Sequence, residues 1–286
     1  MALDRGLAQI ARRRVPSLPV PFDGDPRLAL ITVNFSTTRW LTLMLLTLSE
    51  QDGLGLLHDL VVVDNGSRDG GRPLLRDLAE RVPKLQLVER ERWLHHGPAM
   101  RAGVRALDRA DTVGDRPANV LLFCDPDVIF LRSDALQAVA ECFGHLGAAL
   151  AGEVRHSGGP GPDIQASLFA VRRDVHARRD VYPLVHDGSP AHRHQGSIHA
   201  AGLTVIDLPT NRSGLVLHRG RTAVAAAGEF HSHHPYATAL MQEPHYMGVP
   251  DGEATWASVE RRYERLLRPE HAGELVDTLA ERLGGS

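Results

Sequence analysis

Two carboxylates one residue apart follow directly on a buried apolar run. Asp125 and Asp127 come after Leu121-Leu122-Phe123, within a segment (119–123) that is typical of a strand. Mg²⁺ and Mn²⁺ prefer oxygen ligands, and two carboxylates leaving one strand end can reach the same ion. Such an ion neutralises the charge that develops on a departing diphosphate. An acidic triplet is also common in solvated turns, so the inference depends on its place in the fold.

A second polar turn ends an earlier apolar strand. The run 59–63 stops at Asp64, which is followed by Asn65, Gly66 and Ser67. A carboxylate at a strand end can accept hydrogen bonds from a base N–H group or a ribose hydroxyl. Gly66 allows the backbone to turn sharply. The same block is also typical of a capped strand-to-helix turn, and the residues alone leave both interpretations open.

Apolar strands alternate with amphipathic helices through the first half of the chain. The pattern predicts strands at 28–33, 59–63, 85–88 and 119–123, and helices at 38–49, 72–81, 98–107 and 134–142. This alternation predicts an α/β fold, a mostly parallel sheet with helices on both faces. Ligands bind at the carboxyl ends of the strands in such sheets. We therefore expect the polar turns to converge on one crevice.

The second half has a weaker pattern. We expect strands at 148–154, 165–171, 200–208 and 213–217, and final helices at 254–267 and 272–283. Residues 1–26 are rich in proline near their end and are predicted to form an extended arm. The sequence shows no second domain boundary, so a single domain is expected.

Composition excludes some classes of partner. The 286 residues carry a formal net charge of -3, which does not suggest binding to nucleic acid or to a strongly anionic surface. Of the two cysteines, Cys124 lies in an apolar run and Cys142 in a predicted helix, which favours a reduced, cytoplasmic chain. No apolar stretch is long enough for a transmembrane segment, so none is predicted.

Together these segments resemble the GT-A glycosyltransferases of family 2. The resemblance is carried by residues 30–35, 61–70 and 121–128, and more loosely by 95–103, where His96 replaces the usual asparagine. It implies a GT-A (Rossmann-like) single domain with a nucleotide-sugar-binding half at 27–145. The acceptor-binding half with the C-terminal helices would span 146–286.

The activity that this resemblance implies is metal-dependent and inverting. A hexosyl or deoxyhexosyl group would pass from a nucleoside-diphosphate sugar to an acceptor hydroxyl, with Mn²⁺ or Mg²⁺ as cofactor. A UDP- or dTDP-sugar donor is the family-level expectation, and the acceptor is unknown.

The resemblance also assigns roles to individual residues. Contacts with the nucleotide-sugar are implied for Val33, Asn34, Asp64, Asn65, Ser67, His96, Gly97, Arg101 and Asp125. Asp125 would approach the ribose or the metal, and Asp127 would be the firmer metal ligand. A later histidine often completes such a site, and His218 is the candidate, although a surface histidine in a basic loop is an equal alternative.

The catalytic base is the least determined residue. Inversion requires a carboxylate or a histidine near the acceptor hydroxyl. The family often supplies it from a Glu-Asp pair, which the second half of this sequence does not contain in a clear form. Asp187 is the best positional match and Asp163 is the other candidate. A helix-capping or loop role stays open for both.

Two other classes of function remain. A nucleotidyltransferase also uses a doubly wound sheet with a metal-binding carboxylate. It is disfavoured because the loop at 34–39, after the first strand, has no glycine. A non-catalytic binding module for a sugar or a partner is the other alternative. The intact pair of Asp125 and Asp127 argues against it, and the missing Glu-Asp pair argues for it.

Overall fold

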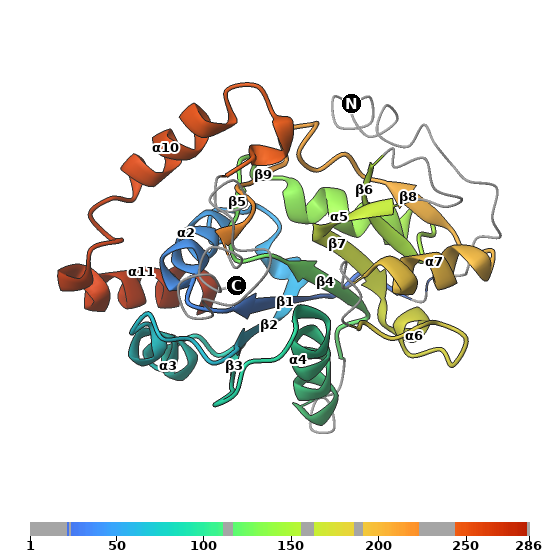
Figure 1. Ribbon diagram of the computed structural model, residues 1–286, viewed down its shortest axis with the longest axis horizontal. Helices are drawn as coiled ribbons and strands as arrows, with labels where there is room; N and C mark the ends of the chain where they lie inside the picture. Colours follow the sequence, from blue (N-terminus) through green and yellow to red (C-terminus); the bar gives the residue numbers. More distant parts are fainter. Residues whose placement is uncertain are drawn as a thin grey trace, which may run out of the picture.

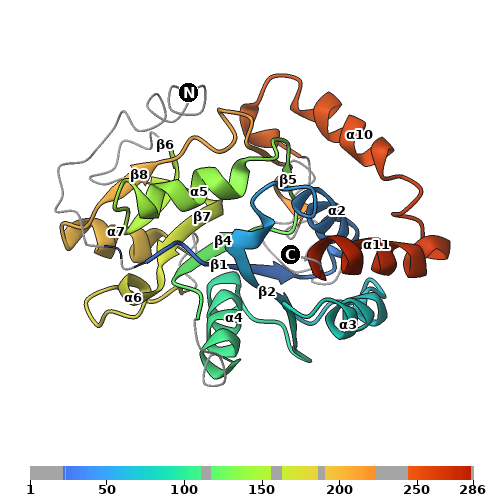
Figure 2. The ribbon, with the colours of Figure 1, turned by 180° about the vertical axis from the view of Figure 1, so that it is seen from behind.

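The fold is built on one seven-stranded sheet covered by helices on both faces (Figures 1 and 2). The computed structural model describes residues 22, 24–110, 117–155, 163–185, 191–222 and 244–284. The strand order is β3-β2-β1-β4-β7-β6-β8. The strands are β1 (Leu28–Asn34), β2 (Leu57–Asp64), β3 (Leu85–Glu89), β4 (Val120–Cys124), β6 (Leu150–Arg155), β7 (Asp163–Arg172) and β8 (Val205–Asp207).

The four strands of the first half are parallel, as the alternating pattern predicts. In the second half β7 is antiparallel to both β4 and β6, and β8 is parallel to β6. One sheet therefore spans both halves of the chain, which confirms the predicted mostly parallel sheet and single domain. A separate two-stranded ladder joins β5 (Val128–Phe130) to β9 (Val216–His218).

Alternate residues of the strands point into two separate apolar cores. Leu28 and Leu30 of β1 belong to one core, together with residues of the helices α2, α3, α5 and α11. Ala29 and Ile31 belong to the other, together with α4, α6 and α7. Both faces of β1 are apolar because both are covered, as parallel strands require. The bounds are α2 (Thr38–Leu48), α3 (Arg72–Arg81), α4 (His96–Ala110), α5 (Ala135–Gly144), α6 (Arg173–His176), α7 (His192–Ala200), α10 (Gly252–Arg262) and α11 (Ala272–Gly284).

The predicted strand at 200–208 is wrong in its first half. Helix α7 continues through Ala200, and Gly202 follows with a φ of 69°. A glycine in this left-handed conformation commonly terminates a helix, so the chain turns there and β8 starts only at Val205. The predicted strand at 213–217 exists as the short β9, which pairs with β5 instead of joining the main sheet. No helix among the described residues is long and apolar enough to span a membrane.

Candidate metal centre and nucleotide-binding crevice

The turn after β4 is held at its start by β7 and at its end by β9. The backbone N–H group of Asp125 donates to the carbonyl of Ser167 on β7 over 2.8 Å, which extends the β4–β7 ladder past the end of β4. Val128 then begins β5, and its partner across the β5–β9 ladder is His218. Because this ladder starts one residue after Asp127, it places His218 beside the two carboxylates.

Asp125, Asp127 and His218 form one cluster. Each offers a ligand atom, and these atoms all lie within 4.8 Å of one another. The Nε2 atom of His218 is 3.2 Å from Oδ1 of Asp127 and 3.6 Å from Oδ2 of Asp125. Two carboxylates and one imidazole suit Mn²⁺ well and also accept Mg²⁺. The structure thus brings together the three residues proposed from the sequence as metal ligands.

The second oxygen of Asp127 is held by the loop after β9. The backbone N–H group of Gly220 donates to Oδ2 over 3.0 Å, and the hydroxyl of Thr222 donates to it over 2.7 Å. Gly220 has a φ of 82°, and a Cβ atom at this position would lie 2.2 Å from Nε2 of His245. Glycine is therefore required at position 220. Because the loop holds Oδ2 of Asp127, Oδ1 of the same carboxylate stays directed at His218 and at the cluster.

The charged groups of the cluster shift the pKa values of one another. Burial alone raises the pKa of Asp127, but the charged His218 and the hydrogen bonds from His218 and Thr222 outweigh it and lower the pKa to about 2. Burial lowers the pKa of His218, and the neighbouring Asp127 and Asp125 outweigh burial and raise it. The two carboxylates thus favour positive charge at this position.

Two side chains that sequence reasoning missed support His218. The backbone N–H group of His218 donates to Oδ1 of Asn211 over 2.9 Å. The side-chain nitrogen of Gln165 lies 3.4 Å from Nδ1 of His218, and Gln165 is 3% exposed. The only sequence signal for Gln165 is a polar residue inside a predicted strand.

Three of the predicted residues lie on helix α4, each in a different setting. Nε2 of His96, its first residue, lies 3.4 Å from Oδ1 of Asp125. A Cβ atom on Gly97 would lie 2.4 Å from the carbonyl oxygen of Val185, so Gly97 allows the chain at 181–185 to approach the helix. Nε of Arg101 is buried without a hydrogen-bond partner.

Asn34 joins the ends of β1 and β2. Its side-chain nitrogen donates to Ser67 Oγ over 3.1 Å, to Thr38 Oγ1 over 3.1 Å and to Asp64 Oδ1 over 3.3 Å. The residue is 0% exposed, and its neighbour Val33 is 5% exposed. The side chain of Asn34 therefore organises the strand ends from below the surface.

Asn65 holds the loop that follows β3. Its side-chain nitrogen donates to the carbonyl of Leu94 over 2.7 Å, and its oxygen accepts from the Leu94 N–H group over 2.9 Å. Trp93 in this loop is 36% exposed, and its ring centroid is 6.2 Å from that of Phe35. The loop after β3 is thus tied to the end of β2 and brings Trp93 next to Phe35.

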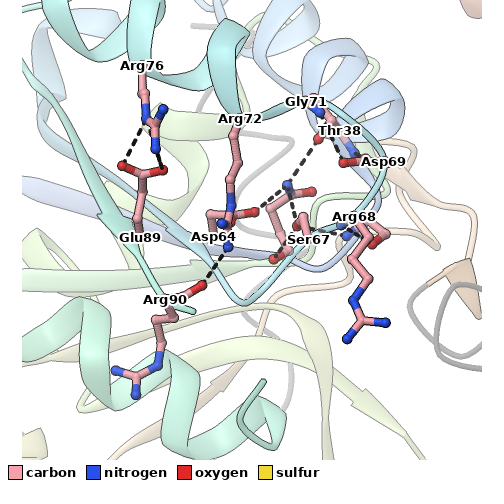
Figure 3. Close-up of polar contacts among 12 residues, drawn as sticks. Thr38, Asp64, Ser67, Arg68, Asp69, Gly71, Arg72, Arg76, Glu89 and Arg90 are labelled. Carbon is pink, nitrogen blue, oxygen red and sulfur yellow. Dashed lines mark hydrogen bonds and ion pairs between the residues drawn. The ribbon is translucent and has the colours of Figure 1, made fainter. Parts of the chain in front are cut away.

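Asp64 is covered by an arginine from α3. Nε of Arg72 lies 2.6 Å from Oδ2 of Asp64, and the side chain of Asp64 is 0% exposed (Figure 3). The carboxylate stands at the strand end predicted from the sequence. Its contact with Arg72 was not predicted.

Of the two candidate bases, the structure describes one. Asp187 lies outside the described residues. Asp163 opens β7 opposite Arg155 of β6, and Oδ1 of Asp163 is 3.9 Å from Nδ1 of His192 in α7. Gln165, two residues further along β7, contacts His218, so Asp163 stands on the strand that supports the metal cluster.

The fold and the cluster together define an α/β domain with a candidate divalent-metal centre at the carboxyl end of its parallel strands. The sequence profile of Glycosyl transferase family 2 matches residues 31–195, more than half of the chain. The chain therefore belongs to this family, and the GT-A resemblance found in the sequence is confirmed. No curated protein sequence matches the chain.

Solved structures share the fold at low sequence identity. The mannosyltransferase PcManGT from Pyrobaculum calidifontis, in complex with GDP-Man and Mn²⁺, is 17% identical with a TM-score of 0.55, covering 99% of this chain and 81% of its own. TarS 1-349 from S. aureus is 14% identical with a TM-score of 0.47, covering 63% of this chain and 58% of its own. The first similarity supports the GT-A fold and is too distant to assign a substrate.

Proposed function

We propose that this protein is a metal-dependent glycosyltransferase that moves a hexosyl or deoxyhexosyl group from a nucleoside-diphosphate sugar to an acceptor hydroxyl with inversion. The observation that carries the proposal is the cluster of Asp125, Asp127 and His218, which stands at the carboxyl end of β4 in a family 2 domain. PcManGT, which shares the fold, was solved with Mn²⁺ and a nucleotide sugar, in keeping with this proposal.

The cluster fits a divalent cation in its ligand chemistry. Asp127 Oδ1, His218 Nε2 and an oxygen of Asp125 would hold the ion, Mn²⁺ or Mg²⁺. When bound, the ion supplies positive charge to the diphosphate leaving group. The hydrogen bonds from Gly220 and Thr222 keep the Asp127 carboxylate in place, so that little reorganisation accompanies loading. His96 stands beside Asp125, where it orients that carboxylate or meets the donor.

The base of the reaction is proposed to be Asp187, with Asp163 as the alternative. Val185, two residues before Asp187, packs its backbone on Gly97, next to His96 at the metal cluster. Asp163 lies about 7 Å along β7 from Gln165, at the strand rise of an antiparallel sheet. The variants Asp187→Asn and Asp163→Asn distinguish the two candidates. Loss of the true base should lower the rate of transfer about 10²- to 10⁴-fold and spare donor binding.

Two further parts of the proposal concern the cellular location of the protein and the division of its chain into two halves. Cys124 and Cys142 are both buried and unpaired, which favours a cytoplasmic location. The nucleotide-sugar-binding half remains 27–145 and the acceptor-binding half 146–286. The polar residues at the ends of β1, β2 and β4 all belong to the first of these halves.

Calorimetry tests the proposal. GDP, CDP, UDP and dTDP are titrated into the protein with and without Mn²⁺, and hydrolysis of the corresponding sugar nucleotides is followed in parallel. Mn²⁺-dependent binding of a nucleotide together with donor turnover is the expected result. Binding without any turnover would instead favour a non-catalytic binding module, and no binding of any nucleotide would refute the proposal.

A further inference from the structure

The Asp64 carboxylate is covered by its neighbours. Its side chain is 0% exposed, with Oδ2 held by Nε of Arg72 at 2.6 Å and Oδ1 held by Asn34 at 3.3 Å. A ligand that reaches the end of β2 therefore meets the residue that covers the carboxylate. That residue is Arg72, the first residue of α3, whose side chain is 31% exposed.

The guanidinium group of Arg72 is fixed at a second point. Its Nη2 atom donates to the backbone carbonyl of Arg90 over 2.6 Å, at the start of the loop after β3 (Figure 3). Nη1 makes no hydrogen bond with any described residue. Two contacts hold the plane of the group, while both N–H bonds of Nη1 and one of Nη2 remain for a ligand. A planar guanidinium group that is held in this way favours a ligand with two adjacent hydrogen-bond acceptors.

The position of Arg72 next to the end of β2 indicates which part of a donor it meets. Asp64 ends β2 and Asp125 follows β4, with β1 between them. Two strand spacings separate these ends by about 10 Å. A diphosphate held at the metal cluster thus leaves its nucleoside to extend toward β2. Trp93, which is 36% exposed, lies next to this position, because a Cβ atom on Gly66, two residues after Asp64, would be 3.2 Å from the backbone nitrogen of Trp93. An exposed aromatic ring here favours a base over a ribose.

We propose that Arg72 reads the base of the donor nucleotide and selects a base with two adjacent hydrogen-bond acceptors. Guanine offers O6 and N7, the pair that arginine binds in a bidentate manner. Cytosine offers O2 and N3. Uracil and thymine carry their carbonyls on either side of an N–H group and present no adjacent pair. This inference rests on the proposed function and replaces the UDP or dTDP expectation with a GDP-sugar first and a CDP-sugar second.

The test compares nucleotides and variants by calorimetry in the presence of Mn²⁺. The wild type should bind GDP at least about 10-fold more tightly than UDP or dTDP. Arg72→Lys keeps the positive charge beside Asp64 but lacks the fork, so this variant should lose the preference while UDP affinity changes little. Arg76→Met is the matched control, because Arg76 lies on the same helix and pairs with Glu89 at the surface.

A second variant controls for a folding defect. Removing Arg72 alone leaves a buried carboxylate without its partner, so Arg72→Met is combined with Asp64→Asn to keep the pair uncharged. The double variant should show the same loss of base preference. Two results overturn the inference: a wild type that prefers UDP or dTDP, or variants that keep the wild-type preference for GDP. A wild type that binds no nucleotide refutes the proposed function as well.

Discussion

Nε2 of His218 lies 3.2 Å from Oδ1 of Asp127, and this contact closes one end of the β5–β9 ladder, where β5 starts and β9 ends. The two side chains are buried together, with Asp127 3% exposed and His218 7% exposed. Neither residue is isolated, because Thr222 and Gly220 hold the carboxylate and Gln165 lies behind the imidazole.

Gln165 is expected to fix the tautomer of His218. A metal on Nε2 requires a proton on Nδ1, so the side-chain oxygen of Gln165 must face Nδ1, where the structure has the side-chain nitrogen at 3.4 Å. With the nitrogen facing Nδ1, that oxygen is buried without a hydrogen-bond partner. Gln165→Met should weaken Mn²⁺ binding about 10- to 100-fold, and Gln165→Glu, which keeps an acceptor, should retain it.

Titration of Mn²⁺ by calorimetry or by electron paramagnetic resonance measures both Gln165 variants. Thermal unfolding of each variant serves as the control for packing. Equal Mn²⁺ affinity in the Met variant and the wild type would show that Gln165 has only a packing role. A Glu variant that binds less tightly than the Met variant would show that His218 needs a donor on Nδ1.

Gly220→Ala is expected to damage the metal cluster through the loop that holds Asp127. The substitution places a Cβ atom against the ring of His245, and it also imposes a φ of 82° on a residue with a side chain. The backbone term alone costs about 1–2 kcal/mol. Gly214→Ala is the matched control, because Gly214 has a φ of 68° but no atom within 4 Å of the added Cβ.

Both glycine variants should lower the free energy of unfolding in chemical denaturation, Gly220→Ala by more. Only Gly220→Ala should also weaken Mn²⁺ binding, since its N–H group donates to Asp127. Equal effects of the two substitutions on Mn²⁺ affinity would contradict the assigned role of the Gly220 loop.

A buried histidine pair should make the fold sensitive to acid. Nδ1 of His176 is 3.4 Å from Nε2 of His194, and burial, assisted by His194, lowers the pKa of His176 to about 4. Because this pKa lies below the unfolded value of 6.5, the unfolded chain binds the proton more tightly. Stability is therefore full above pH 6.5 and falls as the pH drops toward 4, by on the order of 3 kcal/mol.

Urea unfolding at several pH values measures this effect. His176→Leu should give a shallower pH dependence between pH 4 and 6.5, whatever its stability at neutral pH. His145→Gln is the control, because His145 is exposed and should leave the slope unchanged. A His176→Leu profile parallel to that of the wild type would rule out His176 as the source.

The residues at the strand ends could be predicted because the fold class determines where they go. Alternating strands and helices require that Asp64 and Asp125 emerge at one edge of the sheet, and this follows from local pattern alone. His218 could be proposed as a candidate because it follows a predicted strand. Its pairing partner β5 is three residues long and has no periodicity to recognise.

The supporting residues could not be predicted for a different reason. Arg72 and Gln165 act through contacts that depend on how side chains meet across separate elements. In the sequence, Arg72 looks like an ordinary residue at a helix start, and Gln165 looks like an ordinary polar residue in a strand. The antiparallel insertion of β7 between β4 and β6 brings Gln165 to His218, and the weak pattern of the second half does not specify that pairing.

Asp127→Asn tests the central claim most directly. The asparagine oxygen can still accept from Thr222 and Gly220, so the loop should keep its structure while the cluster loses a negative ligand. Asp134→Asn, in the exposed ion pair with Arg132, is the matched control. Nucleotide titration with Mn²⁺ should show at least about 100-fold weaker binding for Asp127→Asn and none of this loss for the control. Mn²⁺-dependent nucleotide binding of wild-type strength in Asp127→Asn would contradict the account.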